Sequence, residues 1–222
     1  MISRRAFWTV ALSASLVLTG CSRAESPRGY PSSVPSATSP LDLLYNASHL
    51  PPERVARLQA EFEKVRTSLA NENPNFAATQ LRILQGGDTF PCRLGGMAFR
   101  VTAFSQSRYC PDGSGGTIVL TPNGMRGAPD VPAIVRFTIQ HEFGHARQNL
   151  EGTLVDRATT PASSQNVEGQ ATCYAGVEMA LAHRQDIGTV EDFLEQLPSD
   201  TLHGSGAMQA EAFMRGVDGG TC

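Results

Sequence analysis

The chain has 222 residues, of which 41% are hydrophobic and 18% are charged, and its formal net charge is −3 at pH 7. A mildly acidic chain with a single lysine, Lys64, lacks the excess of basic residues that binds phosphate groups. This composition excludes a protein that binds nucleic acid through a basic surface, so we expect no nucleic-acid partner.

The N-terminal residues have the layout of an export signal. Arg4 and Arg5 precede a largely apolar run, Phe7–Leu18, which leads into the sequence LTGC, a match to the bacterial lipobox. The run is too short to span a bilayer comfortably, as expected of a signal peptide. We therefore predict a lipoprotein signal peptide over residues 1–20. Lipidation of Cys21 would anchor the protein at the extracytoplasmic face of the bacterial cell membrane.

Composition divides the rest of the chain into two parts. Residues 21–40 are rich in serine, proline and alanine, and they cannot bury enough apolar surface to offset the entropy of ordering. They predict a flexible tether. Residues 41–222 have a length typical of one domain with its own hydrophobic core.

Four cysteines follow the lipobox, and an even number outside the cytoplasm favours disulfide bonds. Spacing alone leaves all three pairings open. We favour Cys92–Cys110, which closes a short segment, and Cys173–Cys222, which fastens the C-terminus to a helix.

The pattern of apolar residues predicts an α+β domain that is mainly helical, with a small antiparallel sheet. Apolar residues recur at helical spacing from Pro52 to Leu69. Residues 97–104 and 117–121 have the composition of short strands, and the glycine-rich residues 111–116 predict a turn between them, in a hairpin or a small antiparallel sheet. Further helices are expected at about residues 132–150, 165–184, 190–197 and 207–217.

The sequence HEFGH at residues 141–145 is the most informative feature of the chain. Residues i and i+4 of a helix share one face, so His141 and His145 can bind one ion, with Glu142 at the edge of that face. Zinc suits such a site, because it binds imidazole and keeps an open position for water. The zinc-bound water has a pKa of about 7, and Glu142 can accept its proton as it attacks a carbonyl. The alternative is an ordinary amphipathic helix with two histidines.

The residues around this motif are consistent with a helix. Asp130 is expected to cap its start, and Gly152 is expected to end it. Gly144 lies inside the helix, where glycine costs about 1 kcal/mol relative to alanine. It either lets another backbone pass close to the metal or reflects tolerant packing.

A catalytic zinc usually has three protein ligands, so the two histidines need a partner. Some zinc peptidases use a histidine ten residues after the first one, but that position holds Glu151. Glu168 is better placed, on the next expected helix. Spacing does not exclude other carboxylates, among them Asp156 and Glu178.

Several ordered motifs point to a family. They are YCP at residues 109–111, HEFGHARQNL at 141–150, EGQATCYAGV at 168–177, and a tail with HGS at 203–205, FMRG at 213–216 and Cys222. They resemble the YCP, HE-x-GH-x-x-QNL, E-L-Q-A-D-C-x-A-G-V and T-H-G-S…F-x-x-G…C motifs of the neutral zinc metallopeptidase family of bacteria. The resemblance covers roughly residues 92–222 and is far more specific than the HExxH pattern alone.

This resemblance implies a zincin-like fold with zinc as its cofactor. It also implies that His141, His145 and Glu168 are the zinc ligands. Glu142 would then be the catalytic acid/base.

The chain departs from the family pattern at two positions. Thr172 stands where the family has an aspartate, and Leu202 stands where it has the threonine before His-Gly. Loss of a group that orients a ligand histidine often costs about 10–100-fold in metal affinity or activity. Because of these departures, we expect the peptidase activity to be reduced more than the binding of zinc.

The favoured function is a zinc-dependent metalloendopeptidase, anchored outside the cytoplasmic membrane, that acts on a peptide or protein substrate. His203 either stabilises the oxyanion or fixes a loop. The alternative is a metal-bound envelope lipoprotein that binds a partner and hydrolyses nothing; Thr172 favours it and Glu142 argues against it. A zinc amidase acting on cell-wall peptides would share the same metal site.

Overall fold

The computed structural model describes residues 47–94, 96–113, 115–126, 128–154 and 161–222, so the predicted signal peptide, tether and Cys21 lie outside the described residues. In chain order, the elements are α2 (Pro52–Glu72), η1 (Pro74–Ala78), β1 (Gln80–Ile83), β2 (Thr89–Leu94), β3 (Met97–Thr102), β4 (Arg108–Cys110), β5 (Thr117–Leu120), α3 (Pro132–Leu150), α4 (Pro161–Ala182), η2 (Arg184–Asp186), α5 (Ile187–Glu195) and α6 (Gly206–Val217). The predicted fold class, α+β and mainly helical, is confirmed.

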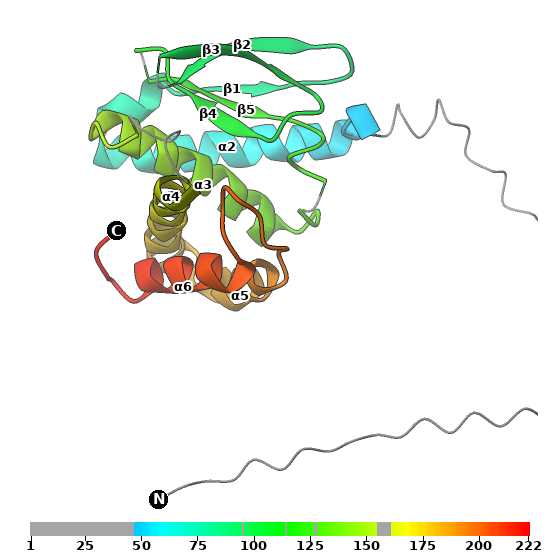
Figure 1. Ribbon diagram of the computed structural model, residues 1–222. Helices are drawn as coiled ribbons and strands as arrows, with labels where there is room; N and C mark the ends of the chain where they lie inside the picture. The colour runs from blue at the N-terminus through cyan, green and yellow to red at the C-terminus, as the bar shows by residue number, and fades with distance from the viewer. Residues whose placement is uncertain (1–46, 95, 114, 127, 155–160) are drawn as a thin grey trace, which may run out of the picture. The chain divides into compact units, whose positions relative to one another are not determined.

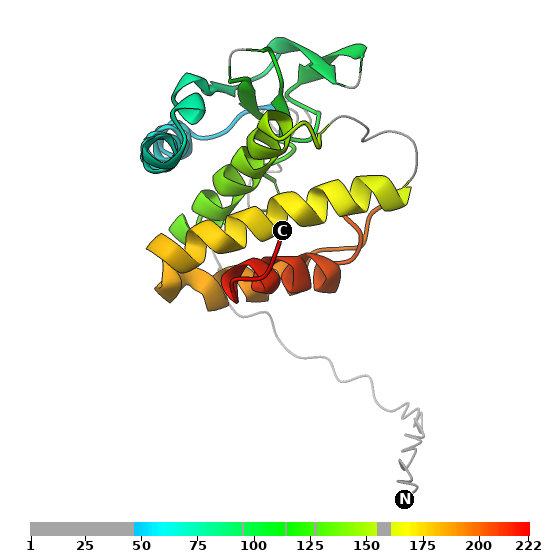
Figure 2. The same ribbon diagram turned by 90° about the vertical axis from the view of Figure 1, so that its left-hand side faces the viewer.

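The elements are arranged in layers. The strands lie at one end of the domain, above α2 and α3, and α5 and α6 lie at the other end (Figure 1). A view from the side shows α4 crossing α3 and packing on α6 (Figure 2). Helix α3 is therefore enclosed, with α2 and the strands on one side and α4 on the other.

Helix α2 forms where the sequence predicted a helix, and it runs to Glu72. Its apolar side chains recur at three- and four-residue spacing and are buried, as Leu58, Phe62 and Val65 show. The proline at its start is tolerated because the first helical N–H groups have no partner within the helix.

The strands form two separate sheets. One has the order β1-β5-β4, in which β5 pairs parallel with β1 and antiparallel with β4. The other is the antiparallel pair β2–β3. Every residue of β5 is buried, as expected of a central strand covered on both faces.

The predicted hairpin between residues 97–104 and 117–121 is wrong. Strand β3 pairs with β2 instead, and β4 is the strand that β5 meets across the glycine-rich turn. The turn itself lies where it was predicted, and the Gly116 N–H donates to Asp112 Oδ1 over 2.8 Å. With three residues, β4 is too short to show the alternation by which strands are recognised in a sequence.

The first predicted disulfide bond, Cys92–Cys110, is present and joins the two sheets. It links β2 to β4, and its two cysteines are buried with Leu84, Val101 and Val119 in a small core of their own. The bond thus fixes the β2–β3 hairpin to the main sheet.

Helix α3 ends as predicted and begins differently. Gly152, two residues after the end of α3, adopts a φ of +73°, a conformation that glycine tolerates at helix ends. The prediction that Asp130 caps the helix is wrong: Val131 occupies the cap position, with no side-chain cap bond. The carboxylate of Asp130 pairs instead with Arg57 of α2.

Packing of Phe143 fixes the rotation of α3 about its own axis. Its ring centroid lies 5.5 Å from that of Phe62 on α2 and 6.0 Å from that of Phe76. Burial of such a side chain contributes about 1.5–3 kcal/mol. Because Phe143 lies between His141 and His145 in the sequence, its contacts with α2 also set the direction in which the histidines point.

The C-terminal helices α4 and α6 pack closely against each other. Helix α4 begins four residues before its predicted start, and α6 begins at Gly206, where Ser205 accepts a bond from the Met208 N–H over 3.2 Å. A Cβ atom at Gly216 would lie 2.0 Å from the Cys173 carbonyl oxygen, so α4 and α6 can approach this closely only through glycine. The second predicted disulfide bond, Cys173–Cys222, is present and ties the chain end to α4.

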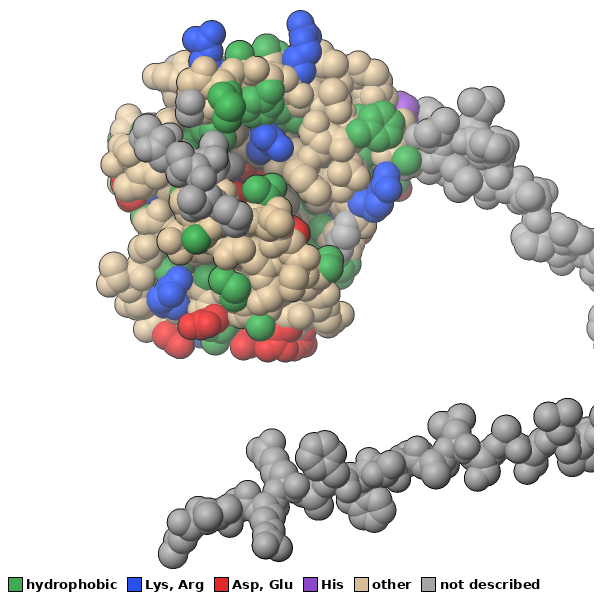
Figure 3. Space-filling view, viewed as in Figure 1, with side chains coloured by type: hydrophobic (Ala, Val, Ile, Leu, Met, Phe, Trp, Pro, Cys, Tyr) green, Lys and Arg blue, Asp and Glu red, His purple; other side chains and the backbone are tan. Residues whose placement is uncertain are grey.

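Charged side chains are unevenly distributed over the face drawn in Figure 3. Lysine and arginine side chains are spaced apart on it, whereas aspartate and glutamate gather along the lower edge, over the α5–α6 end. Within the described residues, no helix combines the length and the apolarity needed to cross a bilayer.

Candidate metal centre

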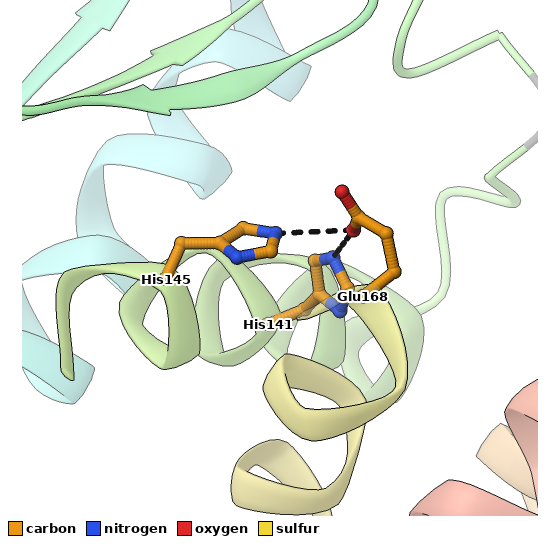
Figure 4. Close-up of side chains that lie close together, drawn as sticks. All are labelled: His141, His145 and Glu168. Atoms are coloured by element: carbon orange, nitrogen blue, oxygen red, sulfur yellow. Dashed lines mark hydrogen bonds and ion pairs between the residues drawn. The ribbon is translucent and has the colours of Figure 1, made fainter. Parts of the chain in front are cut away.

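Two histidines and a glutamate converge where α3 crosses α4 (Figure 4). His141 and His145 lie one turn apart on α3, and Glu168 lies on α4. Glu168 Oε2 is 3.2 Å from His141 Nε2 and 3.1 Å from His145 Nε2. Within the part of the chain that the structure describes, these side chains are the one group of three that can hold a metal ion.

The separations between these atoms fit a zinc ion. Zinc bonds of about 2.0–2.1 Å at tetrahedral angles place neighbouring ligand atoms about 3.3–3.4 Å apart. The distances from Glu168 Oε2 to the two histidine Nε2 atoms, 3.2 and 3.1 Å, are close to that value, and the three ligand atoms all lie within 4.8 Å of one another. Small side-chain movements therefore suffice for one ion to bond all three.

The short distance between the two helices depends on Gly144. A Cβ atom at this position would lie 2.6 Å from the Ala171 carbonyl oxygen and 2.8 Å from Ala171 Cα. Of the two interpretations of this glycine, close passage of another backbone is therefore confirmed. Glu168 comes from that same backbone, one turn before Ala171.

Gln148 fixes the tautomer of His145. The Gln148 Nε2 group donates to the Val167 carbonyl over 2.7 Å and to Gln170 Oε1 over 2.9 Å. Because a carbonyl oxygen only accepts, the amide nitrogen faces Val167, and Gln148 Oε1 faces His145 Nδ1 at 2.8 Å. His145 Nδ1 is therefore the protonated nitrogen, and in the neutral ring Nε2 keeps its lone pair.

Thr172 and Gln209 fix the tautomer of His141 in the same way. Gln209 Nε2 donates to the His203 carbonyl oxygen, so Gln209 Oε1 is the acceptor for the Thr172 hydroxyl, 2.6 Å away. The single hydroxyl proton of Thr172 is then used. Its oxygen, 3.1 Å from His141 Nδ1, accepts a bond from the ring. In the neutral ring, His141 Nε2 therefore also keeps its lone pair.

In their neutral forms, the two imidazoles thus direct lone pairs, rather than N–H groups, at the same carboxylate oxygen, whereas protonated rings would donate to it. Lone pairs and a carboxylate repel one another unless a cation lies between them. A metal ion bound to all three atoms removes the repulsion. Histidines that bind metals usually donate their other N–H group to a neighbouring oxygen, and His141 and His145 both do so.

Glu142 is placed for a different role. Its side chain is buried, it is not part of the ligand group, and its Oε2 atom makes no hydrogen bond to the described residues. A buried carboxylate oxygen without a partner is costly and is characteristic of functional sites. Next to His141 in the sequence, Glu142 is available to bind a proton.

His203 lies beside the group, at the end of a loop that precedes α6. Its Nε2 atom is 3.7 Å from Glu168 Oε2, and its side chain is 38% exposed. Burial raises the pKa of Asp200, but the hydrogen bonds from the His203 backbone and ring and the charge of His203 outweigh it, so the pKa is lowered. The Asp200 carboxylate accepts from His203 Nδ1 over 2.8 Å, which holds the ring with Nε2 toward Glu168.

The other candidates for a third ligand lie elsewhere. The Glu151 carboxylate accepts from the Tyr174 hydroxyl over 2.7 Å. Glu178 lies further along α4, with its carboxylate 3.9 Å from the Arg147 guanidinium. Asp156 is outside the described residues.

Sequence reasoning singled out position 172 but missed the other polar side chains that orient the histidines. Gln148 lies three residues after His145 on α3, a spacing that places the two side chains together, so this partner was detectable. Asp200, three residues before His203, forms a local turn that was detectable too. Nothing in the sequence pointed to Gln209, which reaches the site from a different helix.

Scans of the chain against family models, curated proteins and solved structures gave no match.

Proposed function

We propose that the protein is a zinc-dependent metalloendopeptidase of the kind found in the neutral zinc metallopeptidase family, which its motifs resemble. The main support is that His141 Nε2 and His145 Nε2 lie 3.2 and 3.1 Å from one carboxylate oxygen, Glu168 Oε2. In addition, Glu142, next to His141 in the sequence, has a buried carboxylate oxygen that makes no hydrogen bond to the described residues. His141, His145 and Glu168 would hold the ion. When bound, zinc polarises a carbonyl group and lowers the pKa of water to about 7.

Glu142 would act as the general base and then as the general acid. Its Oε2 atom makes no hydrogen bond to the described residues, so it is free to accept a proton from water and to pass it to the leaving amine. Burial keeps the carboxylate away from bulk water, which strengthens its hydrogen bond to a reacting group.

His203 would stabilise the negative charge that develops on the carbonyl oxygen. Its ring is partly exposed, is held by Asp200 and faces the ligand group without belonging to it. With Nδ1–H bonded to Asp200, the ring would donate from Nε2 in its imidazolium form. A donor placed beside a developing oxyanion commonly contributes 10²–10³-fold to turnover, about 3–4 kcal/mol.

Metal analysis tests the site. The purified protein should contain about one zinc ion per chain, and His145→Ala should lose most of it. Zinc retained at full stoichiometry by His145→Ala, or iron found in place of zinc, would contradict the assignment.

Turnover of a peptide library tests the chemistry. Glu142→Gln keeps the shape of the side chain but cannot accept a proton, so turnover should fall by at least about 10²-fold with zinc retained. Glu151→Gln, at the end of the same helix, is the matched control and should keep full turnover. Hydrolysis by Glu142→Gln at the wild-type rate would exclude Glu142 as the base.

A binding module without hydrolytic activity is the second candidate. One observation favours it: His141 is oriented by the neutral hydroxyl of Thr172 rather than by a carboxylate, which makes the ring less basic. Stoichiometric zinc together with no cleavage across a broad peptide library would establish this alternative.

The protein is also proposed to work outside the cytoplasm. Its two disulfide bonds are typical of exported proteins. We propose that Cys21 holds it to the membrane through a lipid. Cys21→Ser should release it into the soluble fraction and abolish incorporation of a labelled fatty acid; membrane retention of this variant would exclude the lipid anchor.

A further inference from the structure

Gln209 bonds to two parts of the site at once. It is 4% exposed and lies on α6, between the ligand helix α4 and the loop that holds His203. Its Oε1 atom accepts from the Thr172 hydroxyl over 2.6 Å, and its Nε2 group donates to the His203 carbonyl oxygen. One side-chain amide therefore joins the group that orients His141 to the loop that positions the His203 ring.

We propose that Gln209 is a positioning residue that couples metal binding to the order of the His203 loop, residues 200–204. The inference rests on the proposed function and names a link between the metal centre and the loop. Gln209 takes part in no chemical step.

The coupling follows from the direction of each hydrogen bond. A metal ion on His141 Nε2 requires the Nδ1–H group to find an acceptor, and Thr172 Oγ1 is that acceptor. The Thr172 hydroxyl must then donate to Gln209 Oε1, which turns the amide nitrogen toward the His203 carbonyl. Each bond fixes the next, so occupancy of the metal site favours one arrangement of the loop.

The loop is otherwise held mainly by its own contacts. The Asp200 N–H donates to the Gly204 carbonyl oxygen over 3.0 Å, and the Gly204 N–H donates to that of Asp200 over 3.1 Å. The Asp200 carboxylate accepts from the N–H groups of Leu202 and His203. The loop can therefore keep its shape while it moves as a unit. The Gln209 bond ties that unit to the metal centre, as does the 3.7 Å ion pair between His203 Nε2 and Glu168 Oε2.

Amide hydrogen exchange measures the coupling directly. The N–H groups of His203 and Gly204 are both hydrogen-bonded inside the loop, so their exchange rates report its opening. Zinc should slow their exchange in the wild type on the order of tenfold. The same addition should leave their exchange unchanged in Gln209→Met and in Thr172→Val, because each variant breaks the chain of bonds.

Conservative and control variants separate coupling from general destabilisation. Thr172→Ser keeps the hydroxyl and should restore the effect of zinc. Gln196→Met replaces an exposed glutamine at the end of α5 and should behave like the wild type. Zinc affinity in Thr172→Val and in the double variant Thr172→Val/Gln209→Met should be equal, because Gln209 acts on the metal through Thr172.

Two results would overturn the inference. One is a zinc-dependent slowing of loop exchange that persists in Gln209→Met; the other is a zinc affinity that falls further in the double variant than in Thr172→Val. Failure of the proposed function looks different. If the wild type binds no zinc at all, the metal site itself is wrong, and Gln209→Met without metal still has to accelerate loop exchange if its bond to the loop is real. If the wild type binds zinc but cleaves no peptide, only the catalytic role fails, and zinc should still slow loop exchange in the wild type.

Discussion

Substitution of Gly144 by alanine tests whether backbone contact between α3 and α4 sets the geometry of the metal site. The added Cβ atom would lie 2.6 Å from the Ala171 carbonyl oxygen, whereas ordinary contacts begin at 3.4 Å, so the two helices must separate locally by about 0.8 Å. Glu168 lies three residues before Ala171 and moves with it. Ligand distances in a metal site tolerate changes of only about 0.2 Å, so zinc affinity should fall at least tenfold.

The cost in stability of Gly144→Ala can be worked out separately. Overpacking of a close contact costs about 1–3 kcal/mol, and the better helix propensity of alanine returns about 1 kcal/mol. We expect a net loss of about 0–2 kcal/mol in the free energy of unfolding of the metal-free protein. Urea unfolding without metal measures this loss in the free energy of unfolding, and competition with a chromophoric chelator measures zinc affinity.

Gly169→Ala is the matched control for this substitution. It follows Glu168 directly, but its added Cβ atom would find its nearest neighbour, Ala212 Cβ, at 3.8 Å, which is an ordinary contact. It should keep wild-type zinc affinity and gain up to about 1 kcal/mol in stability. A folded Gly144→Ala protein with wild-type zinc affinity would refute the idea that this contact positions the ligands.

Three further substitutions have defined outcomes. Gln148→Leu leaves His145 Nδ1–H without its acceptor and should weaken zinc binding about 10–100-fold in the chelator competition; unchanged affinity would contradict the tautomer assignment. Cys222→Ser opens a loop of 49 residues, which should cost about 4 kcal/mol in the chain-entropy model, lower the melting temperature and leave Cys173 reactive toward thiol reagents. Burial and then the charge of a neighbouring glutamate raise the pKa of Glu178 from 4.5 to about 7, against the effect of a nearby arginine. The folded protein therefore binds more protons than the unfolded one between these pH values, and stability should fall as pH rises through that window. Glu178→Gln should flatten this dependence and stabilise the protein above pH 7 by at most about 3 kcal/mol in urea unfolding; an unchanged pH profile would show that Glu178 titrates normally.

The features that depend on residues close together in the sequence were predictable. The spacing of His141 and His145 placed both on one face of a helix, because that geometry repeats every turn. The apolar repeat from Pro52 predicted α2 for the same reason, and the glycine-rich turn before β5 was located from its composition. The favoured disulfide pairing, with one bond closing a short segment and the other fastening the C-terminus to a helix, is present in the structure.

Tertiary structure decided everything that depends on which elements meet. The sequence left Glu168, Asp156 and Glu178 open as third ligands, and the crossing of α4 over Gly144 brings Glu168 to the histidines. The partner of β3 and the pairing of Asp130 with α2 were likewise set by contacts between distant segments. The spacing of apolar residues indicates which face of a helix or strand is buried, but it does not indicate which other element packs against that face. Gln209 orients a histidine 68 positions earlier in the chain only because α6 packs against α4, and no local pattern in the sequence encodes that contact.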